Sequence, residues 1–97
     1  MKIACTLTGH YQTAQRERWL ALHEKHGLAR NESPDGLRLT FADHPEVEAE
    51  LHALVAVEND CCAWAAWTVE RETEGEIVMA ARSQGGGIAT LHTMFKM

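Results

Sequence analysis

Two adjacent cysteines, Cys61 and Cys62, lie one helical turn after Glu58 in this sequence. Thiolates are ligands for soft ions such as Hg(II), Cu(I), As(III) and Zn(II), and a cysteine can also act as a redox nucleophile. Neighbouring cysteines close a disulfide only through a strained eight-membered ring, so we expect no structural bridge between these two. Thiols next to a carboxylate therefore indicate metal or redox chemistry.

A helix is predicted over residues 45–63 or 64, because Pro45 suits a first helical position and Asp43 or His44 can cap it. At about 100° per residue, Glu58 falls in the middle of its apolar stripe, with Cys61 and Cys62 on either side. An ionised, unpaired carboxylate in such a place costs several kcal/mol, so it must take a proton, find a partner or bind a cation. We expect Glu58 to be an auxiliary ligand or an acid.

A first strand is predicted over residues 3–8, where Ile3, Cys5 and Leu7 alternate with smaller residues. Cys5 would then face the helices, and we expect it to meet Cys61, Cys62 and Glu58. Three sulfur ligands suit Hg(II) or As(III), and a fourth ligand from Glu58 or a histidine suits tetrahedral Zn(II). His10, just after this strand, is our candidate for that histidine.

Three alternatives stay open. Paired thiolates can hold an organometal while a nearby acid protonates its carbon, as in organomercurial lyase. That parallel concerns residue types only, since the sequences are not similar. Cys61 or Cys62 can instead be the nucleophile of a thiol redox protein. The cysteines can also be core residues of a non-catalytic, dimer-forming module. The sequence does not decide whether the chain is an enzyme.

The other elements must position this site. We predict helices over 13–26, capped by Thr13 or Gln12 and stopped by Gly27, and over 88–95. Strands are predicted over 37–41, 67–73 and 76–83, with a loop over 31–36 and a hairpin turn at Glu74-Gly75. The order β-α-β-α-β-β-α predicts an α+β two-layer sandwich, with helices on one face of a four-stranded mixed sheet.

The composition excludes several classes of function. The 97 residues suit a single domain over 1–97. The net charge of −5 and scattered basic residues argue against nucleic-acid binding. No apolar run is long enough to span a membrane, and no signal peptide is evident, so we expect a cytoplasmic protein. The chain has three cysteines, and an odd number argues against a framework of disulfide bonds.

The chain resembles a group of small bacterial proteins with three shared features. These features are an early strand cysteine, a strand of the form Asp-Gly-Leu-x-Leu-x-Phe, and a helix ending in Glu-x-x-Cys-Cys-x-aromatic. They correspond here to Cys5, to residues 35–41 and to residues 58–64, where Ala63-Trp64 replaces the more frequent Pro-Phe. The resemblance supports a site at Glu58 and the cysteines, and it implies no particular activity.

Overall fold

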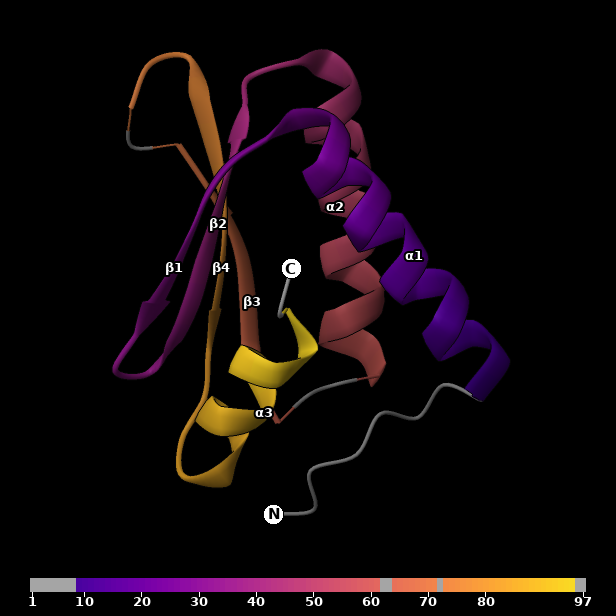
Figure 1. Ribbon diagram of the computed structural model, residues 1–97, viewed down its shortest axis with the longest axis vertical. Coiled ribbons are helices and arrows are strands. Elements are labelled where there is room, and N and C mark those ends of the chain that lie inside the picture. The colour runs from indigo at the N-terminus through magenta and orange to yellow at the C-terminus, as the bar shows by residue number, and fades with distance from the viewer. Residues whose placement is uncertain (1–8, 62–63, 72, 96–97) are drawn as a thin grey trace.

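The computed structural model describes residues 9–61, 64–71 and 73–95, without the side chains of residues 9–13 and 61. Its elements are, in chain order, α1 (Gly9–His26), β1 (Gly27–Ser33), β2 (Gly36–Ala42), α2 (Pro45–Cys61), β3 (Ala66–Glu70), β4 (Glu76–Arg82) and α3 (Gly86–Met94). The fold is α+β, as the sequence predicts (Figure 1). The strand predicted over residues 3–8 lies outside the described residues.

The four described strands form one antiparallel sheet in the spatial order β1-β2-β4-β3. β1 with β2, and β3 with β4, are hairpins, and the two hairpins join along β2 and β4. The predicted mixed sheet is therefore wrong for these strands. In an arrangement of two hairpins, each sharp turn reverses the chain, and here the two central strands also run in opposite directions.

Strand β1 is missing from the sequence prediction, which has a loop over residues 31–36. Asn31 to Ser33 pair instead with β2, and the turn consists of Pro34 and Asp35. β1 is an edge strand with polar residues on both faces, so no alternating apolar pattern marks it. Gly36 of β2 permits the backbones of β2 and β4 to approach closely, since a Cβ at this position would lie 1.8 Å from the carbonyl oxygen of Ala81.

α1 and α2 lie side by side, run in opposite directions and stand on the same side of the sheet (Figure 1). α1 begins at Gly9, four residues before the predicted start, so Thr13 and Gln12 lie inside the helix and are not caps. It ends at His26, immediately before Gly27, as predicted. The predicted start of α2 at Pro45 is confirmed as well.

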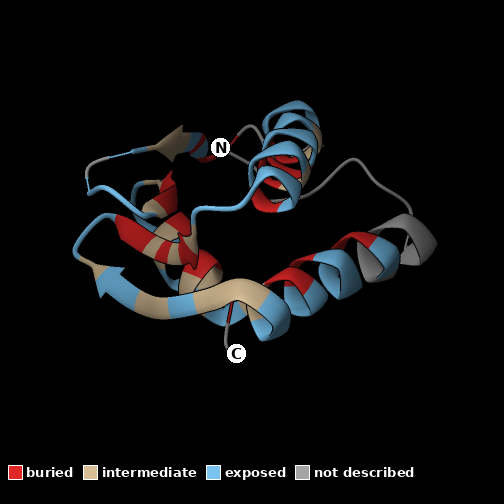
Figure 2. Cartoon of the chain, turned by 90° about the horizontal axis from the view of Figure 1, so that it is seen from above, coloured by how far each residue is buried: buried red, intermediate tan, exposed pale blue. Residues whose placement is uncertain are grey.

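The buried residues form one apolar cluster in which all three helices contact the sheet. Every second residue of β2 and β4 joins it, which gives the sheet one apolar inner face. Figure 2 shows the same division on the helices, whose outer sides are exposed. The largest of the fully buried side chains are those of Phe41, Phe95, Leu37, Leu39, Leu51, Leu54, Ile77, Met79 and Leu91.

The last three predicted elements, two strands and a helix, agree with the structure apart from their ends. The predicted turn between β3 and β4 is confirmed at Gly75, whose φ of 84° favours glycine. β3 ends at Glu70, not at Thr73, and α3 begins at Gly86, two residues before the predicted start. Among the described residues, no helix combines the length and apolar character that crossing a bilayer requires.

Candidate functional site

The candidate site lies at the carboxyl end of α2, whose amino end is fixed by a cap. The backbone N–H of Glu46 donates to Nδ1 of His44 at 3.1 Å, so His44 is the cap. From there, Val47, Leu51, Leu54 and Val55 turn inward and are buried, as the helical wheel predicts. Glu58 is the next residue in this stripe.

Glu58 is only 3% exposed, so the prediction that its side chain belongs to the buried stripe is confirmed. Its Oε1 accepts a hydrogen bond at 3.2 Å from Nε2 of Gln15 on α1. The same amide nitrogen donates to the carbonyl oxygen of Leu54 at 3.1 Å. Gln15 is itself 7% exposed, and the two residues form a buried polar contact within the α1–α2 interface.

The cysteines fall at or beyond the limits of the described residues. Cys61 is the last residue of α2, one turn after Glu58, and its side chain is not described. Cys62 and Cys5 lie outside the described residues. His10 belongs to the first turn of α1, again without a described side chain. The predicted meeting of these four residues with Glu58 therefore stays a prediction.

Both sides of the cysteine pair are anchored to the core. Before it, the side chain of Asn59 brackets the backbone of Trp67: its Nδ2 donates to the Trp67 carbonyl at 3.1 Å, and its Oδ1 accepts from the Trp67 N–H at 3.3 Å. After it, the carbonyl oxygen of Trp64 accepts from Ser83 Oγ at 2.8 Å. The rings of Trp64 and Trp67 meet edge to face with centroids 6.5 Å apart. The two ends of this short connection are thus held at fixed positions.

A second polar cluster joins the other ends of the same two helices. His26, the last residue of α1, stacks on His44 with ring centroids 5.2 Å apart. Its Nε2 lies 3.4 Å from Oε2 of Glu46, and Lys25 Nζ lies 3.4 Å from the same carboxylate. Hydrogen bonds from His26, and next from Lys25, hold the pKa of Glu46 below its ordinary value. Among the described residues, the ligand atoms of His26, His44 and Glu46 lie within 4.8 Å of one another.

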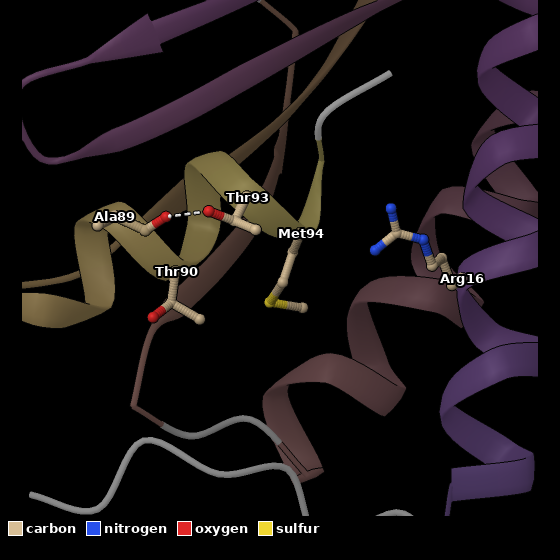
Figure 3. Close-up of a pocket in the computed structure, with 5 residues that line it drawn as sticks. All are labelled: Arg16, Ala89, Thr90, Thr93 and Met94. Atoms are coloured by element: carbon tan, nitrogen blue, oxygen red, sulfur yellow. Dashed lines mark hydrogen bonds between the residues drawn. The ribbon is translucent and has the colours of Figure 1, made fainter.

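A shallow pocket of about 320 Å³ lies between α1 and α3 (Figure 3). It is lined by Arg16, Ala89, Thr90, Thr93 and Met94. The two threonine hydroxyls donate to carbonyl oxygens within α3, at 3.0 Å each. Because this internal bonding uses their protons, Arg16 supplies the main donor group toward the hollow, and no described metal-ligand cluster lines it.

Comparison of this chain with protein-family models, curated proteins and solved structures finds no significant match. The assignment of function therefore rests on the chemistry and geometry of these groups.

Sequence reasoning missed two parts of this arrangement. Gln15 carried no signal, because a glutamine in a helix is usually exposed, and its partner is 43 positions away. The meeting of His26 with His44 and Glu46 depends on α1 and α2 lying antiparallel. That packing could have been proposed from their apolar faces, but the exact pairing of their ends could not.

Proposed function

We propose that this protein binds a soft metal or metalloid ion through Cys5, Cys61 and Cys62, with Glu58 as an auxiliary ligand or proton donor. His10 is the candidate for a further ligand. The ion is Hg(II), Cu(I), As(III) or Zn(II), and the proposal includes cleavage of an organometal at the same thiolates. The reducing cytoplasm is the proposed setting, because thiols remain reduced there.

The observation that carries this proposal is the burial of Glu58 one turn before the cysteine pair. Burial penalises a charged carboxylate, and the amide of Gln15 donates one hydrogen bond to it. A cation bound by the adjacent cysteines would further stabilise the charged form. A protonated Glu58 would instead be an acid placed next to the proposed thiolates, which is the arrangement that protonation of a metal-bound carbon requires.

The position of Cys61 favours metal binding over redox catalysis. It is the last residue of α2, where the helix dipole presents partial negative charge. Reactive cysteines gain their thiolate character at amino ends of helices or beside cations. A thiolate at a carboxyl end, next to a buried glutamate, needs a positive partner, and a bound metal ion supplies one.

The proposal is tested by titrating the reduced protein anaerobically with each of the four ions. We expect thiolate-to-metal absorption that saturates at one ion per chain, with release of thiol protons. Cys61→Ser should weaken the tightest binding at least tenfold. Elemental analysis of the protein as purified identifies the ion it carries. Unchanged affinity in Cys61→Ser would contradict the proposal, and rapid alkylation of one cysteine without metal affinity would favour the redox alternative.

The role of Glu58 is tested with a matched pair of charge changes. Glu58→Gln removes the buried charge but keeps an oxygen for Gln15, while Asp60→Asn removes a charge on the exposed side of the same turn. We expect Glu58→Gln to weaken metal binding by about tenfold or more, and Asp60→Asn to change it by less than about threefold. Equal effects of the two variants would remove Glu58 from the site.

A further inference from the structure

The ends of α1 and α2 opposite the cysteines bring together three metal-ligating side chains from separate positions in the fold. His26 closes α1, His44 caps α2, and Glu46 lies in the first turn of α2. Figure 1 shows these two helix ends at the same end of the molecule. Glu46 and Glu58 are 12 residues apart on one helix, so about 18 Å separates this cluster from the candidate thiol site.

The spacing of these groups fits a tetrahedral metal centre. Zinc bonds to histidine nitrogen and carboxylate oxygen are about 2.0–2.1 Å long, which places two tetrahedral ligand atoms about 3.4 Å apart. The distance from His26 Nε2 to Glu46 Oε2 is 3.4 Å. The ligand atoms of all three residues lie within 4.8 Å of one another, and His44 must turn out of its stack on His26 to complete the set.

We propose that His26, His44 and Glu46 form a second metal site, which takes a divalent cation of the zinc type with water as the fourth ligand. Two imidazoles and one carboxylate are a recurring ligand set for Zn(II) with an open position. The metal replaces the proton between His26 and Glu46 and ties the end of α1 to the start of α2. This inference does not rest on the thiol proposal, because it uses none of the same residues.

Two local contacts oppose the binding of a metal ion at this site. Lys25 Nζ lies 3.4 Å from both oxygens of Glu46 and repels a cation placed there. His44 Nδ1 accepts a hydrogen bond from the backbone N–H of Glu46. A metal at Nδ1 takes this lone pair, and a metal at Nε2 requires the ring proton to sit on Nδ1, so either mode of coordination breaks this hydrogen bond. Zinc affinity therefore depends on the charge of Lys25 as well as on the three ligands.

The test uses calorimetric titration of a chain in which all three cysteines are serine, with Zn²⁺ as the probe. We expect one ion per chain, and at least a tenfold loss of affinity in His26→Gln, Glu46→Gln and His44→Asn. The His44→Asn variant keeps a capping side chain while it removes the imidazole. His52→Gln is the matched control, since His52 is exposed in the middle of α2. Binding that is unchanged in the first three variants, or lost equally in His52→Gln, would overturn the proposal.

Two further measurements keep the test decisive if the serine chain does not fold. In the native chain, Co²⁺ should give a set of visible d–d bands that disappears in Glu46→Gln, while any sulfur charge-transfer band from the cysteines remains. Lys25→Gln should bind Zn²⁺ roughly fivefold more tightly, because it removes a cation about one ion-pair distance from the site. Cobalt bands that remain in Glu46→Gln, or unchanged zinc affinity in Lys25→Gln, would count against this location.

Discussion

The carboxylate of Glu58 and the amide of Gln15 form the buried polar contact between α1 and α2. Gln15 divides one donor nitrogen between Glu58 Oε1 and the carbonyl oxygen of Leu54. A buried acceptor that loses such a donor bears the full cost of its lost hydration. Gln15 thus orients Glu58 and lowers the energetic cost of keeping it in the interface.

Replacement of Gln15 tests this role at the level of one side chain. We expect Gln15→Leu to lower the free energy of unfolding by about 1–3 kcal/mol, because it leaves two buried acceptors without this donor. Adding Glu58→Leu should recover part of the loss, because the double variant buries no carboxylate. Urea denaturation of the three proteins gives these values. A double variant that is less stable than Gln15→Leu would show that Glu58 stabilises the interface through other contacts.

At the residue scale, the sequence predicted that Glu58 lies in the apolar stripe of its helix, but it did not predict which side chains surround the carboxylate. The helical period alone placed Glu58 among Val47, Leu51 and Leu54, and its burial confirms that placement. The partner on α1 depends on how two helices pack, which a local period does not contain. The same limit explains why His44 was identified as a possible cap, while its stacking on His26 was not foreseen.

Strand β1 and helix α3 stabilise each other through polar contacts at the edge of the sheet. Arg30 of β1 donates to the carbonyl oxygen of His92 at 2.8 Å and to that of Phe95, at the carboxyl end of α3. His92 Nε2 lies 2.7 Å from the carbonyl oxygen of Gly36 in β2. The guanidinium of Arg30 donates hydrogen bonds to carbonyl groups at the carboxyl end of α3, and its positive charge interacts favourably with the negative end of the helix dipole.

Arg30→Met is therefore expected to loosen α3 more than the rest of the protein. The loss of two charge-assisted hydrogen bonds should lower the free energy of unfolding by about 1–3 kcal/mol. Hydrogen exchange should show the largest increase in the amides of α3. Arg16→Met, which changes an exposed arginine of α1, is the control and should have little effect. Uniform loss of protection across the sheet would contradict a local capping role.

The contacts of Arg30 also explain which elements the sequence could predict. α2 and β2 carry strong local patterns: β2 extends one residue beyond its predicted limits at each end, and α2 begins at its predicted start. In β1, Arg30 and the exposed Glu32 pair with each other, and both also contact His92 of α3, about 60 positions away. The stability of β1 depends on pairing with β2 and on α3, so no local pattern reveals it. The prediction of a mixed sheet came from interpreting the chain as strand–helix–strand crossovers, whereas the pairing of β1 with β2 makes the described strands two antiparallel hairpins.

The carboxylate of Glu70, on the outer face of the β3–β4 hairpin, makes the free energy of unfolding depend on pH. The hydroxyl of Thr68, and then Arg82, hold the pKa of Glu70 below its ordinary value. Thr68 Oγ1 donates to Glu70 Oε2 at 2.8 Å, and Arg82 Nη2 lies 3.2 Å from the same oxygen. A carboxylate with a lowered folded-state pKa contributes stability above its unfolded pKa. That contribution is lost as the pH falls through the folded value.

Unfolding measured from about pH 7 to pH 3 should therefore separate wild type from Glu70→Gln. The wild type is expected to be the more stable protein near neutral pH, and the difference should shrink at the acid end. Glu74→Gln, which changes an exposed residue of the adjoining turn, is the control and should show a smaller pH-dependent difference. A difference that stays constant over this range would mean that Glu70 acts through packing alone.

At the scale of the whole molecule, metal binding and folding are linked through α2. The helix has Glu46 of one proposed site near its amino end and Cys61 of the other at its carboxyl end. The net charge of −5 attracts cations to the folded chain, although salt screens this effect. An ion that binds the folded state only must raise stability in proportion to the logarithm of its free concentration.

The expected size of this linkage can be measured by thermal unfolding. At a free ion concentration 100 times the dissociation constant, one site adds about 2.7 kcal/mol. For a domain of about 100 residues, this corresponds to a rise in Tm of roughly 10–20 °C. Hg(II) at that concentration should produce the rise in wild type and in Glu46→Gln, and about half of it or less in Cys61→Ser. Zn²⁺ should stabilise the serine-substituted chain only while Glu46 is present. If Hg(II) and Zn²⁺ added together to the wild type raise Tm by the sum of their separate shifts, the two sites are independent. A combined rise no larger than one of the separate shifts would show that both ions bind in one place.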